Sequence, residues 1–176
     1  MIRRINPTVV AMENVTRLLG EEIFADFLRA LDRAGFTVWA KSVYCPNYGV
    51  PQIRRRLVLL ASRLGPIELT PPTHQDYPTV LETIGHLEAI PAGGTSTIDP
   101  LHRSQGLSPL NFERIRQAKP GGSWHDWDKS LRAKCHLKDS GSTYTAVYSR
   151  MRWEAPAPTI TTQFYAFGTG RFGHPE

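Results

Sequence analysis

Cysteine is scarce in this chain, and long apolar runs are absent. Only Cys45 and Cys135 occur among 176 residues, too few for a disulfide framework or a four-ligand zinc cluster. No run approaches the roughly 20 apolar residues that span a bilayer, and no signal-peptide pattern opens the chain. We therefore expect a cytoplasmic protein with no metal site, neither secreted nor membrane-spanning.

Basic residues are missing from one internal stretch. Residues 66–102 hold no Lys or Arg and five Asp or Glu, whereas residues 1–65 hold ten basic against five acidic residues, and residues 103–152 hold ten against four. The whole chain has a net charge of +5. Two basic blocks around an acidic one favour a polyanionic partner such as nucleic acid. Basic faces that contact only water are the alternative.

Hydrophobic patterning predicts an α/β arrangement at the start of the chain. Residues 7–13 and 56–62 are short apolar runs typical of buried strands, and residues 36–43 alternate as a strand does. Between them, residues 20–34 carry apolar side chains at helical spacing. We interpret this part as a partial Rossmann-like sheet, with too few strands to close on its own.

The pattern changes near residue 65, where Pro and Gly become frequent. Helices are expected over residues 78–89 and 108–119, and a strand over residues 143–151. The sequence therefore predicts two domains, an α/β part at 1–65 and an irregular α+β part at 66–176.

Polar residues stand at the ends of two predicted strands. Glu13 and Asn14 follow the first strand, and ligands of open α/β sheets bind at the carboxyl ends of strands. A loop or cap role is the alternative. An arginine run leads into a later strand, where alternation places Arg54 and Arg56 on one face and Arg55 on the other. Two guanidinium groups on one face suit a phosphate or a base carbonyl, and a solvated strand edge is the alternative.

These motifs occur in an order that is specific to one family. Glu13-Asn14-Val15 after a buried strand, followed by Gly-Val-Pro-Gln-x-Arg-x-Arg at residues 49–56, resembles the bacterial DNA (cytosine-5) methyltransferases. Later motifs resemble the target-recognition segment of one branch of that family. They are Thr73-His74, residues 111–115, residues 120–124 and residues 156–162.

The resemblance implies a mechanism. A cytosine leaves the duplex for a pocket, a cysteine thiolate attacks its carbon 6, and carbon 5 then takes the methyl group of S-adenosylmethionine. By resemblance, Glu13 holds the pyrimidine nitrogen and stabilises or protonates it. Gln52, Arg54 and Arg56 fix the base and the nearby backbone, and Asn14 and Gln52 are supporting residues. A positioned acid and guanidinium supply the charge sink that attack on the ring needs.

Other parts of the family pattern are missing. Only 12 residues precede Glu13, too few for the glycine-rich S-adenosylmethionine loop or the Pro-Cys-Gln nucleophile loop. The resemblance therefore implies a fragment or subunit of a DNA methyltransferase of restriction-modification type. We expect it to bind double-stranded DNA and, alone, to be inactive and without cofactor. It is then a split subunit that needs a complementary polypeptide, a degenerate gene product or an excised part of a longer enzyme. A non-catalytic DNA-binding or assembly module is the alternative.

Five residues of the second domain are candidates for DNA contact. They are Lys119, Ser123, Arg150, Arg152 and Arg171. The first two belong to a Lys-Pro-Gly-Gly-Ser loop that can offer a lysine and backbone amides to phosphate, and a flexible helix stop is the alternative. The arginines are candidates for phosphate or guanine edges.

Three further motifs resemble functional signatures only superficially. Cys45-Pro46 follows the Glu-Asn-Val motif and reverses the order of the family nucleophile, so we interpret it as a loop thiol. The glycines of residues 168–173 fit GxGxxG but do not join a strand to a helix. Cys135-His136 lacks a second ligand pair at metal-binding spacing.

Overall fold

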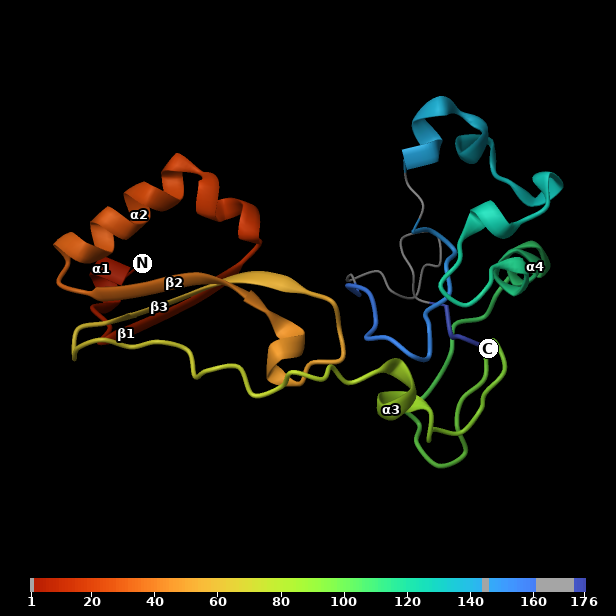
Figure 1. Cartoon of the computed structure of the whole chain (residues 1–176), viewed down its shortest axis with the longest axis horizontal. Coiled ribbons are helices and arrows are strands. Elements are labelled where there is room, and N and C mark those ends of the chain that lie inside the picture. The colour runs from red at the N-terminus through yellow and green to blue at the C-terminus, as the bar shows by residue number, and fades with distance from the viewer. Residues whose placement is uncertain (1, 144–145, 161–172) are drawn as a thin grey trace. The chain divides into compact units, whose positions relative to one another are not determined.

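The computed structural model describes residues 2–143, 146–160 and 173–176. These residues divide into two units, unit 1 from Met1 to Asp76 and unit 2 from Tyr77 to Glu176 (Figure 1). No helix in the described part has the length and apolar character of a bilayer span.

Unit 1 contains a three-stranded sheet formed by β1 (Val9–Asn14), β2 (Thr37–Tyr44) and β3 (Arg55–Ser62). The strand order is β1-β3-β2, and β3 is antiparallel to both neighbours. Because Asn14 pairs with Leu57 and Tyr44 pairs with Arg55, the carboxyl ends of β1 and β2 meet the amino end of β3. The residues expected to carry chemistry therefore lie at one end of the sheet.

One face of this sheet is covered by α2 (Glu22–Arg33), beside α1 (Ile2–Ile5) (Figure 1). Leu57, Leu59 and Ala61 of β3 are completely buried against this layer. The 3-10 helix η1 (Thr16–Gly20) joins β1 to α2. This mixed sheet-and-helix unit confirms the predicted α/β class.

The segment after β3 stays with unit 1 because it is hydrogen-bonded to η2, the 3-10 helix Cys45–Tyr48. The Tyr48 hydroxyl donates to the Thr70 carbonyl at 3.0 Å. The backbone N–H groups of Thr73 and His74 donate to the Asn47 carbonyl at 2.9 and 3.0 Å. The boundary between the units therefore lies at Asp76, later than the expected position near residue 65.

Unit 2 is built from short helices and turns around a small core of Ala118, Trp124, Trp127 and Val147. Its elements are α3 (Val80–Ile84), α4 (Pro109–Gln117), η3 (Trp124–Asp126), η4 (Lys129–Leu131), η5 (Lys134–Leu137) and η6 (Asp139–Thr143). As predicted, Ser108 caps α4, its Oγ accepting from the Asn111 N–H at 3.3 Å.

Two predicted elements of unit 2 are wrong. The helix over residues 78–89 is a shorter one, because a capping box formed by Thr79 and Glu82 starts α3 at Val80 and the helix ends at Ile84. The strand over residues 143–151 is not formed in the described part of that range. Tyr148 has a φ of 50°, which an extended strand does not allow, and Arg150 makes only isolated bridges.

Candidate active site and nucleic-acid interface

The register between β1 and β3 brings Glu13 and Arg56 together. Glu13 pairs with Val58, so Arg56, two residues before Val58, lies diagonally opposite on the same sheet face. The Arg56 Nε is 2.8 Å from the Glu13 Oε1. Two residues that are 43 positions apart in sequence thus form one ion pair at the end of the sheet.

The pair leaves polar atoms available for a ligand. The Arg56 side chain is 20% exposed and the Glu13 side chain 59% exposed, so the guanidinium is the more enclosed partner. Arg56 also donates from Nη1 to the Arg55 carbonyl at 2.7 Å. Among the described residues, no donor reaches Glu13 Oε2 and no acceptor reaches Arg56 Nη2. An acceptor and a donor therefore stand side by side, open to a third group.

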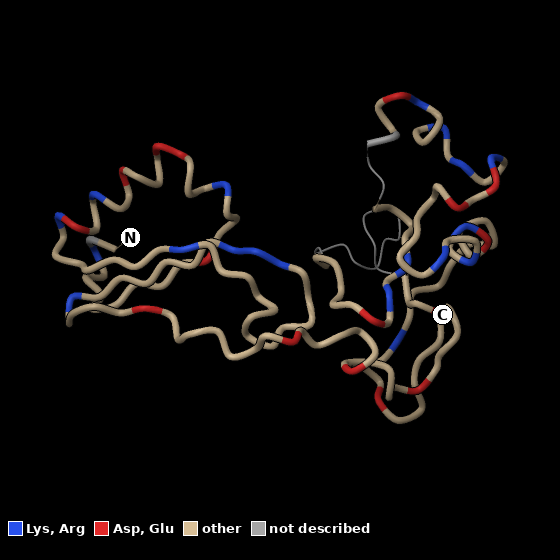
Figure 2. Tube along the Cα trace, viewed as in Figure 1, with Lys and Arg blue, Asp and Glu red and all other residues tan. Residues whose placement is uncertain are grey.

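Arg55 has a different environment, on the face of the sheet that α2 covers. Its guanidinium lies 4.4 Å from the centre of the Tyr44 ring, and Tyr44 is its register partner on β2. Figure 2 shows the continuous basic stretch at the start of β3. Within that stretch, Arg56 faces Glu13 and Arg55 faces away from it.

Arg54, Gln52 and Asn14 lie close to the pair in the chain but take other contacts. Arg54 precedes β3, so strand alternation does not extend to it. Its Nη1 lies 3.5 Å from Gln52 Oε1, and its carbonyl accepts from the Cys45 N–H at 2.9 Å. The Asn14 Oδ1 accepts from the Val15 N–H at 2.8 Å, so this amide contacts the backbone directly after β1.

The turn before Gln52 requires glycine at position 49. Gly49 has a φ of +77°, and a Cβ there would lie 2.7 Å from the His74 imidazole. His74 is itself held by a 2.8 Å contact between its Nδ1 and Thr73 Oγ1. The sequence shows Thr73-His74 only as a motif, and no local signal in it indicates that the His74 ring lies over Gly49.

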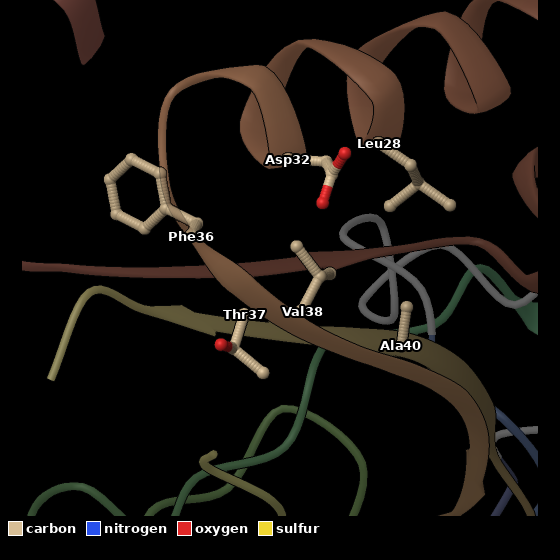
Figure 3. Close-up of a pocket in the computed structure, with 6 residues that line it drawn as sticks. All are labelled: Leu28, Asp32, Phe36, Thr37, Val38 and Ala40. Atoms are coloured by element: carbon tan, nitrogen blue, oxygen red, sulfur yellow. The ribbon is translucent and has the colours of Figure 1, made fainter. Parts of the chain in front are cut away.

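A cavity of about 490 Å³ lies between α2 and β2. Val38 and Ala40 point from β2 toward Leu28 and Asp32 of α2 (Figure 3). Asp32 is the one charged residue among those that line it, and no glycine-rich turn borders it. The lining holds no Lys, Arg or His to pair with the carboxylate of S-adenosylmethionine, so the cavity does not fit the cofactor.

The Lys119–Ser123 loop of unit 2 uses its amides inside the protein. The N–H groups of Lys119 and Ser123 donate to Asp126 Oδ2 at 3.2 and 3.0 Å, and Gly121 and Gly122 donate to backbone carbonyls. Ser123 is 7% exposed. The exposed Lys119 side chain is therefore the part of this loop best placed to meet a phosphate.

The arginine candidates divide by their contacts. The Arg150 guanidinium donates to three backbone carbonyls, those of Ala118, His174 and Pro175, so it ties the last described residues to the end of α4. The exposed Arg152 lies across Gly121, where an added Cβ would meet its Nε. Arg171 lies outside the described residues.

Neither cysteine belongs to a metal cluster. In residues 2–143, 146–160 and 173–176, no three His, Cys, Asp or Glu side chains gather as metal ligands do. The His136 ring stacks on Trp124 with centroids 4.6 Å apart, and burial lowers its pKa. His136 is therefore part of the packing around the unit 2 core.

The sequence pattern of the C-5 cytosine-specific DNA methylase family matches residues 1–169. The chain belongs to this family. It is 45% identical over 181 residues to the Type II methylase M.HgiDII of Herpetosiphon aurantiacus, a match that covers all of this chain and 51% of that protein. It is 32% identical over 136 residues to the Type II methyltransferase M1.HphI of Haemophilus parahaemolyticus, with 75% of this chain and 36% of that protein covered. The chain thus spans about half the length or less of these relatives.

A solved structure supports the fold. It is described as a DNA modification methyltransferase encoded within a prophage of E. coli, and its TM-score to this chain is 0.59 at 15% identity. The match covers 90% of this chain and 54% of the other. The small antiparallel sheet and its helix therefore belong to a methyltransferase architecture.

Proposed function

We propose that this chain provides the base-holding site and the DNA-recognition part of a DNA cytosine-5 methyltransferase. The complete enzyme would transfer a methyl group from S-adenosylmethionine to carbon 5 of a cytosine flipped out of duplex DNA. The observation that carries the proposal is the 2.8 Å ion pair between Glu13 and Arg56. It places a carboxylate and a guanidinium, each with a free hydrogen-bonding atom, in one solvent-accessible position.

The pair suits the polar edge of cytosine. That edge presents an amino group, a ring nitrogen and a carbonyl oxygen in a row. Glu13 Oε2 would accept from the amino group or hold a proton at the ring nitrogen, and Arg56 Nη2 would donate to the carbonyl oxygen. Attack at carbon 6 pushes negative charge toward these atoms, so a fixed donor and acid lower the barrier. Arg56 holds the carboxylate in place before the base arrives, which avoids a reorganisation cost.

The remaining machinery would come from polypeptide that this chain does not include. The nucleophilic cysteine and the cofactor loop belong to the family pattern, and the chain matches 51% of its Herpetosiphon relative. We expect this chain alone to show no S-adenosylmethionine binding in the micromolar range by calorimetry. Micromolar binding would show that the cofactor site lies within it.

Unit 2 would supply the contacts to DNA, with Lys119 as one phosphate contact. Counterion release makes the affinity for duplex DNA fall steeply with salt, and losing one phosphate contact lowers the slope of log K against log salt by about 1. In fluorescence anisotropy titrations at several salt concentrations, Lys119→Gln should lower this slope by about 1. Ser123→Ala should leave the slope unchanged, because Ser123 is buried. Salt-independent binding would contradict the DNA role.

Methyl transfer by a chimera tests the activity. This chain would be joined in one polypeptide to the part of the M.HgiDII sequence that it does not match. The chimera is expected to incorporate 5-methylcytosine into duplex DNA, and a Glu13→Gln chimera is the matched control. A folded chimera that binds DNA and S-adenosylmethionine without producing 5-methylcytosine would contradict the proposal and favour a non-catalytic binding module.

A further inference from the structure

Unit 2 contains a cavity of about 870 Å³ that the sites described above do not use. One wall is α4, where Phe112, Ile115 and Arg116 lie on one side of the helix because they are three and four residues apart. Leu81 and Ile84 of α3 form another wall. The volume lies within the range of about 300–1,000 Å³ that is usual for small-molecule sites. The cavity therefore has the size of a site for a small organic ligand.

The walls of the cavity are connected to one another. The Leu81 N–H donates to the Trp153 carbonyl at 3.0 Å, which joins α3 to a second segment of the lining. The Trp153 ring lies edge-on to the His174 ring, with centroids 4.9 Å apart. Arg150, which also lines the cavity, donates to the carbonyl of His174 and to that of Ala118 at the end of α4. The cavity is thus part of one hydrogen-bonded framework within unit 2.

Two aromatic side chains of the lining are accessible to a ligand. Phe112 is 45% exposed, and among the described residues no ring stacks on it. Trp153 is half-buried. Aromatic side chains of this kind are stacking surfaces for nucleobases, and they accept any base because every base has a π-face.

Polar side chains of the lining have hydrogen-bonding atoms to spare. Among the described residues, none forms a hydrogen bond or ion pair with the side chain of Arg103 or Gln105. Arg116 contacts Glu113 at 3.5 Å between Nη2 and Oε2, and both side chains are exposed, so a ligand can displace this weak pair. Guanidinium groups bind phosphate through paired hydrogen bonds. An amide such as that of Gln105 can both donate to and accept from the edge of a base.

The two carboxylates of the lining are compensated within the protein. Glu88 accepts three hydrogen bonds from residues 96–97. Burial lowers the pKa of Arg150, and the charge of the neighbouring Glu176 acts against that shift, so these two groups offset each other. The charge that remains for a ligand is therefore positive and comes from the arginines at 103 and 116.

We propose that this cavity is a nucleotide-binding site, in which an aromatic base lies against Phe112 and Trp153. Arg103 and Arg116 are the partners of its phosphate, and Gln105 contacts the edge of the base. A nucleotide combines a π-face, a hydrogen-bonding edge and a negative charge, and the lining offers a partner for each. The site differs from the base-holding pair of unit 1, because all of its residues belong to unit 2.

Two sources supply a ligand of this chemistry. One is a free mononucleotide, and the other is an unstacked nucleotide within a DNA strand. The second source rests on the proposed function, in which unit 2 contacts DNA, whereas the first does not. The experiments below distinguish the two.

Fluorine NMR of the intact chain tests the site. Labelling with 5-fluorotryptophan gives one signal for each of the four tryptophans, and Trp153→Phe assigns the one in the cavity. Deoxycytidine monophosphate and deoxyadenosine monophosphate should each shift the Trp153 signal, whereas inorganic phosphate should not. The signals of Trp39 in unit 1 and of the buried Trp124 and Trp127 should stay and report an intact fold. An equal shift with inorganic phosphate would show an anion patch only and overturn the nucleotide site.

Phe112→Ala and Leu110→Ala form a matched pair of variants. Both side chains belong to α4 and are about half exposed, Phe112 at 45% and Leu110 at 49%, and only Phe112 lines the cavity. Loss of a stacking surface should make Phe112→Ala bind the mononucleotides about fivefold or more weakly, and Leu110→Ala should change the affinity less than about twofold. Arg116→Gln should weaken the binding of deoxycytidine monophosphate and leave that of deoxycytidine, which has no phosphate, unchanged.

Two DNA duplexes distinguish the sources of the nucleotide. One carries a single bulged nucleotide, and the other is identical except that the bulge lacks its base. If the DNA strand is the source, the chain should bind the first duplex more tightly, the Trp153 signal should shift, and Phe112→Ala should remove the preference. Equal affinity for the two duplexes, together with a Trp153 shift caused by mononucleotides, assigns the site to a free nucleotide.

The outcomes also separate this site from the proposed function. A Trp153 signal that no nucleotide shifts, or equal losses in Phe112→Ala and Leu110→Ala, would overturn the site. A chimera that methylates DNA although no nucleotide shifts Trp153 would reject the site and keep the function. Nucleotide binding at Trp153 in an inactive chimera would do the reverse.

Discussion

Unit 1 buries Leu57, Leu59 and Ala61 completely between a sheet and a helix, whereas unit 2 has short helices and irregular backbone around a small core. In unit 2, polar side chains fix the backbone. The Glu88 carboxylate accepts from Ser96 and Thr97. In other loops, Asp126 and Thr79 accept hydrogen bonds from backbone N–H groups, and Arg150 donates to backbone carbonyls.

Because the two units are stabilised in different ways, they should differ in which substitutions they tolerate. Burial of apolar area is non-directional, so unit 1 tolerates polar changes on its surface and holds the Glu13–Arg56 pair on rigid strands. In unit 2, single carboxylate and guanidinium groups hold the backbone through directional hydrogen bonds. One substitution that removes such a group can therefore free a whole loop. Loops of that kind suit a surface that contacts DNA.

The largest expected effect is on catalysis in unit 1. In the chimera, Glu13→Gln should lower the methylation rate by about 10²–10⁴-fold, the usual loss for a positioned acid or base. DNA affinity should stay nearly unchanged, because the carboxylate acts mainly in the transition state. Arg55→Ala is the control: Arg55 faces Tyr44 and not Glu13, so its loss should be nearly neutral. An equal loss of methylation rate in Glu13→Gln and Arg55→Ala would contradict the assignment of Arg55 and Arg56 to opposite faces of β3.

The next effect concerns the core of unit 1. Leu59→Ala removes a completely buried side chain and should lower the free energy of unfolding by about 2–5 kcal/mol. Chemical denaturation followed by hydrogen exchange would locate the loss in residues 9–62. An equal loss of protection around Trp124 would show that the two units unfold as one.

A polar contact should matter comparably in unit 2. Arg150→Met keeps the aliphatic stem and removes the donors to the carbonyls of Ala118, His174 and Pro175. Hydrogen bonds from a charged group contribute about 1.5–3 kcal/mol, so the free energy of unfolding of unit 2 should fall by an amount of that order. The melting temperature of unit 2 should fall with it. An unchanged melting transition would mean that these carbonyls find water at no cost.

The smallest effect is a local dependence on pH. Hydrogen bonds from Ser96 and Thr97 lower the pKa of Glu88. The folded pKa therefore lies below the unfolded one, so the loop is stabilised at neutral pH, and this stabilisation is lost as pH falls through the folded pKa. Exchange of the Thr97 amide, corrected for intrinsic rates, should speed up in acid. Glu88→Gln should remove that dependence, and a flat wild-type profile would contradict it.

Much of unit 1 could be predicted from the sequence because its elements follow simple periodicities. The strands and the amphipathic helix over 20–34 appear as patterns, and the structure has α2 at Glu22–Arg33. Of the two strands expected to be buried, β3 is buried, whereas β1 has no buried residue because it lies at the edge of the sheet. The contact between Glu13 and Arg56 could not be predicted, because strand register depends on pairing between distant segments. Each residue was identified from its motif, and their ion pair appears only in the structure.

Unit 2 was less predictable for a physical reason. Its backbone depends on single hydrogen bonds, which leave no periodic signal in the sequence. Residues 143–151 have the composition of a strand, yet Tyr148 adopts a positive φ. The α4 start was predictable because Ser108-Pro109 is a local capping signal.

The central claim is that Glu13 and Arg56 act as one unit on the base, and a double-mutant cycle in the chimera tests it most directly. Single-turnover methylation rates would be measured for the parent, Glu13→Gln, Arg56→Ala and the double variant. Because the arginine both holds the carboxylate and donates to the base, Arg56→Ala should lie between the parent and Glu13→Gln. The double variant should be slower than Glu13→Gln by clearly less than the factor that Arg56→Ala costs on its own. Losses that multiply in the double variant would show that the two side chains act independently and would contradict the account.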